Sequence, residues 1–111
     1  MTGTVTQTPI QKLITFAITF SQLADHNAQR QGRHKSAGAQ DAAWYNRVRA
    51  NAFRLAAYVF EDELHDLQEA TNALKLWISL ADNAPCIDAY RELLREAERL
   101  QREEEQVEVG A

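Results

Sequence analysis

The chain has 111 residues, enough for one domain with a hydrophobic core of its own. Four Gly and two Pro among 111 residues indicate helices with few turns, and the single Cys86 excludes an internal disulfide and predicts a reducing, cytoplasmic location. The net charge of −4 conceals an asymmetry: residues 1–60 hold seven Lys and Arg against two acids, a net +5, whereas residues 61–111 hold five against fourteen, a net −9.

The first predicted element is a helix over about residues 9–31. The stretch TPIQ at residues 8–11 has the spacing of a capping box with Pro at the first helical position, and Gly32 can end the helix in the left-handed conformation. The segment LITFAITFSQL, residues 13–23, also alternates like a strand, but the sequence offers no second strand to pair with it, so a helix is favoured. The strongly apolar residues 13–20 are too few to span a membrane, and the N-terminus lacks the basic residues of a secretory signal.

The middle of the chain predicts a basic loop and then one long helix or two shorter ones. The loop is GRHKSAGAQ at residues 32–40, and residues 39–84 contain neither Gly nor Pro. Apolar residues then follow in alternating steps of four and three, a heptad seam: Phe53, Ala57, Phe60, Leu64, Leu67, Thr71, Leu74, Ile78 and Ala81. This seam favours a single helix of about 41 residues, whereas Asp66 at the end of EDELHD can cap a new helix and favours a break. Both alternatives stay open.

The last predicted helix begins where Asn83 or Ala84 supplies the cap and Pro85 the first turn. We expect it to fray near Glu105 and to leave residues 106–111 as a flexible tail, with residues 1–8 as a second tail and residues 9–105 as a single domain. The predicted fold is therefore all-α, a bundle of three or four helices completed by dimerisation. In one version of it, two shorter helices fold along a long central helix.

The sequence gives little support for catalysis. Six of the nine residues from Glu61 to Glu69 are Asp, Glu or His, and their spacing suits metal ligands. A di-iron bundle, however, needs a second Glu-x-x-His motif, and magnesium-dependent all-α nucleotide hydrolases need a Glu pair that is missing. No partner for Cys86 as a nucleophile can be placed. We expect no enzyme, no metal and no cofactor, with an all-α nucleotide hydrolase as the lesser alternative.

Nucleic-acid binding is the main alternative function. Basic residues gather in the loop and on one face of the helix after it, and such residues contact phosphates. The pI of about 5.3 argues against this function, and the same cations can instead pair with the acidic half. The residues concerned are Arg30, Arg33, Lys35, Arg47 and Arg54.

Two segments, residues 13–23 and ALKLWISLA at 73–81, are apolar all round except for one narrow polar stripe. Helices of this kind are either central in a fold or covered by a partner. We therefore assign a dimer or partner surface to Phe16, Ile18, Phe20, Leu76, Trp77 and Leu80, and we place the aromatic residues Trp44, Phe53, Phe60 and Trp77 most simply in the core.

These features predict a non-enzymatic interaction protein, a small adaptor or inhibitor that forms a homodimer and binds a larger partner. A small acidic bundle is typical of phage- or plasmid-encoded inhibitors that occupy a basic groove in a host nucleic-acid machine. The acidic face of the last helix would make that contact, through Glu92, Glu96, Glu103, Glu104 and Glu105. No motif of a known family supports the assignment.

Overall fold

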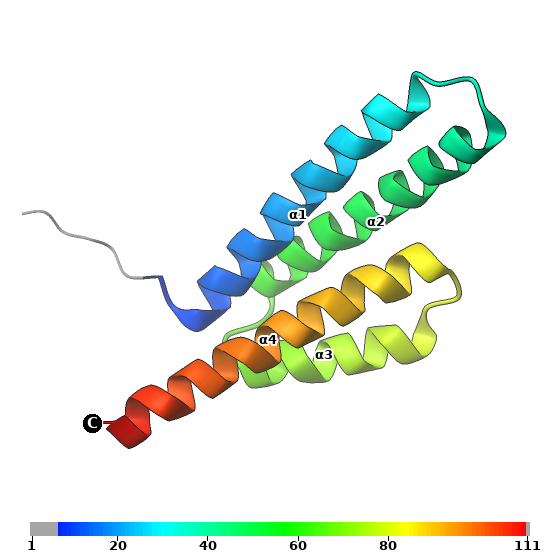
Figure 1. Ribbon diagram of the computed structural model, residues 1–111. Helices are drawn as coiled ribbons and strands as arrows, with labels where there is room; N and C mark the ends of the chain where they lie inside the picture. Colours follow the sequence, from blue (N-terminus) through cyan, green and yellow to red (C-terminus); the bar gives the residue numbers. More distant parts are fainter. Residues whose placement is uncertain (1–6, 111) are drawn as a thin grey trace, which may run out of the picture.

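The computed structural model describes residues 7–110, with side chains to residue 106, and this part of the chain is all-α (Figure 1). Its four helices are α1 (Pro9–Gly32), α2 (Ala37–Asp62), α3 (Leu67–Leu80) and α4 (Ala84–Gly110). The all-α class predicted from the sequence is confirmed, and the two predicted tails lie partly outside the described residues.

The N-terminal cap of α1 agrees with the sequence prediction, but its C-terminal cap does not. Thr8 accepts a hydrogen bond from the backbone N–H of Gln11 at 3.3 Å, and the Gln11 side chain accepts one from the N–H of Thr8 at 2.9 Å, which is the predicted capping box. The predicted left-handed Gly32 is wrong, because no described residue has a positive φ. Instead the helix tightens at its end, and the N–H groups of Arg33 and His34 donate to carbonyls three residues back.

The basic loop is shorter than the sequence indicated. Ser36 caps α2 by accepting a hydrogen bond from the N–H of Ala39 at 3.2 Å, so the helix already begins at Ala37. The Gln40 side chain reaches back and donates to the carbonyl of Gly32 at 3.2 Å, which holds the connection to the end of α1.

The long central helix does not form, and the predicted alternative of a break near residues 61–66 is confirmed. Asp66 takes an extended backbone conformation and accepts a hydrogen bond from the N–H of Glu69 at 2.8 Å, as an N-cap does. The Glu69 carboxylate in turn accepts from the N–H of His65. The heptad seam nevertheless lies in the core on both sides of the break, because every one of its residues from Phe53 to Ala81 is buried or half-buried.

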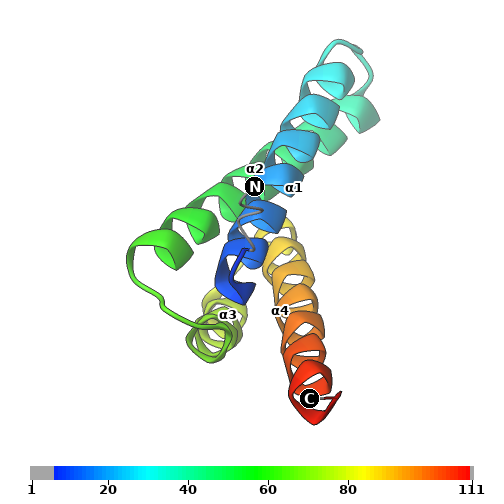
Figure 2. The same cartoon turned by 90° about the vertical axis from the view of Figure 1, so that its left-hand side faces the viewer.

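The helices form two hairpins, α1 with α2 and α3 with α4, and the second hairpin packs mainly through α4 against α2 (Figure 1). The N-terminal half of α1 also reaches the second hairpin (Figure 2). The ring centroids of Phe20 in α1 and Phe53 in α2 lie 5.9 Å apart. Phe60 of α2 stacks on Trp77 of α3, with the ring centroids also 5.9 Å apart. α1 therefore lies along α2, and α4 packs against both α3 and α2.

The last helix begins as predicted and ends later. The Asn83 side chain accepts a hydrogen bond from the N–H of Cys86 at 3.0 Å, and Pro85 lies buried in the first turn. The helix continues past the predicted end at Glu105 to Gly110, so the tail predicted over residues 106–111 is helical as far as it is described. Ion pairs from Arg99 to Glu96 and Glu103 stabilise this part, and Glu and Gln favour helix.

Candidate interaction surfaces

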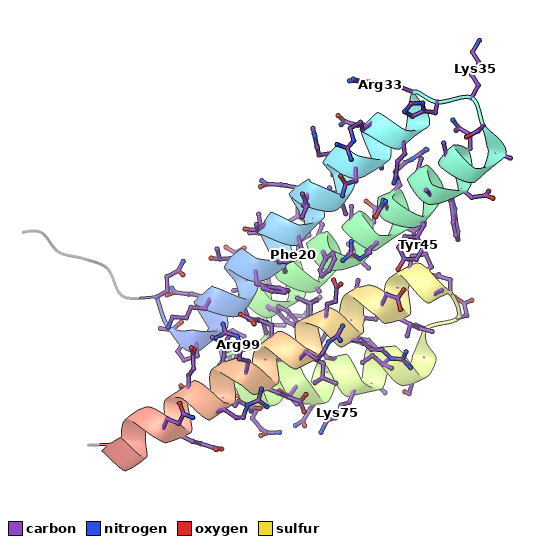
Figure 3. All side chains as sticks on the ribbon, in the orientation of Figure 1. Phe20, Arg33, Lys35, Tyr45, Lys75 and Arg99 are labelled. Atoms are coloured by element: carbon purple, nitrogen blue, oxygen red, sulfur yellow. The ribbon has the colours of Figure 1, made fainter. Side chains whose placement is uncertain are left out.

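A basic tip closes the first hairpin. Arg30 and Arg33 come from the end of α1, Lys35 from the loop, and Arg47 from α2, and all four side chains are exposed. Arg33 and Lys35 extend away from the helices (Figure 3), and Arg33 and Arg47 line one open cavity with Gly32. Among the described residues none of these four cations forms an ion pair. The tip lies at the opposite end of the molecule from the C-terminus of α4 (Figures 1 and 2).

Arg54, the fifth residue of the predicted nucleic-acid contact, is differently placed. Its guanidinium pairs with Asp25 of α1 and donates a 2.9 Å hydrogen bond to Asn51, so it ties α2 to α1. The structure thus brings four of the five predicted residues together and gives the fifth a structural partner.

A polar crevice runs between α2 and α4. Tyr45 donates a hydrogen bond to Asp88, and one turn further along Arg49 binds both oxygens of Glu92 at 2.6 and 2.7 Å. The hydrogen bond to Asp88, then burial, raise the pKa of Tyr45 above 10.0, because the phenolate could not donate and would face a carboxylate. The crevice is a cavity of about 470 Å³ that Arg91 and Arg95 also line.

The predicted acidic face of α4 is partly neutralised by its neighbours. Glu92 pairs with Arg49, while Glu96 and Glu103 pair with Arg99 at 2.7 and 2.9 Å. Glu104 and Glu105 are exposed in the described part of α4 and have no ion pair there. The carboxylates left to meet a partner therefore lie toward the C-terminal end of α4.

The predicted apolar surface divides into an inner and an outer set. Phe16 stacks on Phe20 with ring centroids 4.3 Å apart, and Trp77 packs between Phe60 and Tyr90, so these aromatics serve the molecule's own core. Outside lie three aliphatic residues, of which Leu80 is 71% exposed: Ile18, Leu76 and Leu80. Leu80 borders a small pocket between α3 and α4 that also contains Trp77, Cys86 and Tyr90.

The sequence reasoning missed the open face of α2. Trp44, expected in the core, is 55% exposed, and Leu55 and Tyr58 on the same side of the helix are 60% and 56% exposed. The expectation for Trp44 failed because the buried face of α2 is lined by Ala and Phe residues, which pack closely against α1 and α4. The spacing of 44, 55 and 58 was the signal that could have found this face.

The acidic stretch at residues 61–69 serves as a connection. Asp66 and Glu69 bind backbone N–H groups at the start of α3, as described above. Within the described part of the chain, no three His, Cys, Asp or Glu side chains are grouped as they would be around a metal ion. The described helices also include none that is long and apolar enough to cross a membrane.

Comparison of this chain with protein-family models, with curated proteins and with solved structures finds no match. The surfaces of the molecule are therefore the evidence for its function.

Proposed function

We propose that this protein is a non-enzymatic interaction module that works as a homodimer and binds a larger partner protein. The observation that carries the proposal is the number of large apolar side chains left in solvent: among the residues whose side chains are described, seven are at least 42% exposed. Single exposed apolar residues are ordinary, but groups of them on one helix face mark contact surfaces.

The partner surface that the geometry favours is the end of α3. Leu76 and Leu80 are one turn apart and 55% and 71% exposed, and the pocket beside Leu80 has aromatic walls. An apolar anchor next to a small pocket is typical of the centre of a protein interface. Asp82 at the rim supplies a polar edge.

The experiment is affinity capture from the source cells, followed by titration of the captured and purified partner. The double substitution Leu76→Asp with Leu80→Asp should weaken the binding of the partner at least tenfold. Ser79→Asp, between these two residues and also exposed, adds one negative charge to the same turn without removing a leucine and should leave binding unchanged. A purified partner that binds the double variant as well as the wild type would place the contact elsewhere, and failure to obtain any stoichiometric partner would overturn the proposal.

The narrower prediction of an inhibitor that occupies a basic groove depends on the C-terminal end of α4. There Glu104 and Glu105 are exposed and Glu103 is paired only within its own helix. Replacing all three with Gln should release a nucleic-acid machine from inhibition while leaving the helix in place, because Glu and Gln have similar helix propensities.

Direct nucleic-acid binding is the second candidate function. The observation in its favour is the basic tip, where Arg30, Arg33, Lys35 and Arg47 extend into solvent without a carboxylate partner among the described residues. Such a cluster can bind phosphates even on an acidic chain, provided that the acidic end stays away from the ligand.

A further inference from the structure

The exposed face of α2 carries a second heptad seam, separate from the one in the core. Starting at Asp41, its positions follow in alternating steps of three and four residues, and all are exposed except the half-buried Val48. The 3–4 spacing keeps these residues on one side of the helix, where a second helix can pack along them. The seam consists of Asp41, Trp44, Val48, Asn51, Leu55, Tyr58 and Asp62.

Two copies of this helix can pack along the seam in an antiparallel arrangement. They then form the isologous interface of a twofold dimer, in which both copies use the same patch. The apolar residues of such an interface are Trp44, Val48, Leu55 and Tyr58.

The charges beside the seam select one antiparallel register. Arg47 and Glu61 flank it on the same side, both are exposed, and neither forms an ion pair within the described residues. When Val48 packs against the second copy's Tyr58, Arg47 faces the second copy's Glu61, and twofold symmetry repeats this ion pair at the other end. The neighbouring register, with Val48 against Asn51, would instead bring Arg47 opposite Arg54, which is repulsive.

The remaining flanking positions accept the selected register. Arg54 meets its own copy near the twofold axis, which is one contact between like charges against two in the neighbouring register, and Asp25 already supplies each Arg54 with a counterion. On the other flank Ala52 is buried against the chain's own helices, so it takes no part in the contact. The helix is open for the contact because its buried face is directed the other way, toward α1 and α4.

From this exposed seam and its charge complementarity we infer that the open face of α2 binds a second copy of this chain, antiparallel, with Val48 against Tyr58 and Arg47 paired with Glu61. The inference rests on the proposed homodimeric interaction module and assigns its dimer interface. It leaves Leu76 and Leu80 of α3 free for the larger partner.

The test is the molar mass of the full chain, measured by light scattering after size exclusion over a range of concentrations with a reductant present. The wild type should have twice the chain mass of 12.6 kDa. Leu55→Asp should raise the dimer dissociation constant about a hundredfold, because the seam would then bury an unpaired charge. The matched control Leu76→Asp, an equally exposed leucine on α3, should remain dimeric.

The register is tested by charge exchange. Arg47→Glu and Glu61→Arg should each weaken the dimer about tenfold, since each creates two like-charge contacts. An equimolar mixture of the two variants should form heterodimers of wild-type strength, because both ion pairs are then restored. Circular dichroism confirms that each variant keeps its helix content.

The possible results test the dimer interface separately from the proposed partner binding. A wild-type chain that stays at 12.6 kDa at 100 µM, or a dimer insensitive to Leu55→Asp, overturns the inference. A mixture of the charge variants that remains monomeric overturns the register. None of these results bears on partner binding through α3, which the Leu76 and Leu80 substitutions test separately.

Discussion

Thr71 places a hydroxyl group inside the hydrophobic core of α3. The residue is only 4% exposed, and its Oγ1 has no hydrogen-bond partner among the described residues. An unsatisfied buried hydroxyl costs about 1–3 kcal/mol, and valine has nearly the same shape without it. We therefore expect Thr71→Val to raise the free energy of unfolding by about 1 kcal/mol.

Urea denaturation of the Thr71→Val variant measures this gain. Thr19→Val on the exposed face of α1 is the control and should change the free energy of unfolding by no more than about 0.5 kcal/mol. A loss of stability on replacing Thr71 would mean that its hydroxyl does have a partner in solution.

The environment of Tyr45 predicts that the free energy of unfolding falls in alkaline solution. Its phenol donates to Asp88, and this hydrogen bond together with burial raises its pKa above 10.0 in the folded state. The stabilisation is therefore complete below pH 10 and is lost as the pH rises through the raised pKa, because the folded state then resists ionisation that the unfolded state accepts. Tyr45→Phe should lower the free energy of unfolding by about 1 kcal/mol at pH 7 and reduce the decline above pH 10.

Denaturation of the wild type and the Tyr45→Phe variant at a series of pH values between 7 and 11 gives this difference directly. Tyr58→Phe on the open face of α2 serves as the control, since Tyr58 is exposed. Identical pH profiles for the wild type and Tyr45→Phe would contradict the role assigned to the hydrogen bond.

At the scale of the elements, Asp66 separates α2 from α3. Its carboxylate accepts the hydrogen bond from Glu69 N–H that begins the new helix. Removing an N-cap of this kind costs about 1 kcal/mol. Asp66→Ala should therefore lower the free energy of unfolding by about 1 kcal/mol, whereas Asp62→Ala, at the end of α2 and exposed, should have little effect. Equal losses for the two variants in urea denaturation would show that Asp66 acts only through its charge.

Some features of the helices could be predicted from the sequence and others could not. Capping residues such as Thr8 and Asn83 were predictable, because a cap depends on neighbours only three residues away. The core seam from Phe53 to Ala81 was predictable too, but its period is the same in one helix or two, so it could not decide between them. The direction of the chain after residue 63 depends on tertiary packing, and the heptad spacing of apolar residues carries no information about that packing.

The candidate surfaces were less predictable for a related reason. Apolar residues near one another in sequence, such as Phe16, Ile18 and Phe20, were assigned to one surface, yet Phe20 packs inward against Phe53 and Ile18 is exposed. Trp44 was expected inside because of its size. Which of two apolar faces a helix buries is decided by how many neighbours it has, and four helices leave the outer face of α2 uncovered.

At the scale of the whole molecule, the charge asymmetry along the chain becomes a separation in space. Of the four ion pairs in the described part, only Arg49 with Glu92 joins the basic half to the acidic half. The basic tip and the C-terminal end of α4 lie at opposite ends of the molecule (Figures 1 and 2). Mutual neutralisation of the two halves therefore accounts for only a small part of the asymmetry.

This separation makes the second candidate function testable through salt dependence. If each cation of the basic tip neutralises one phosphate of duplex DNA, the logarithm of the binding constant should fall with the logarithm of salt concentration with a slope of about −3 to −4. The double variant Arg33→Gln with Lys35→Gln should reduce the magnitude of that slope by about 2, because two phosphate contacts are lost. Lys75→Gln changes an exposed cation on α3 away from the tip and should leave the slope unchanged (Figure 3).

Fluorescence anisotropy with a labelled duplex between 20 and 200 mM salt measures the slope. Absence of binding at the lowest salt would remove nucleic acid as a ligand of the tip. The tip would then act as a long-range attractive patch for an acidic surface on the larger partner, which the same substitutions would reveal as a slower association rate with an unchanged dissociation rate.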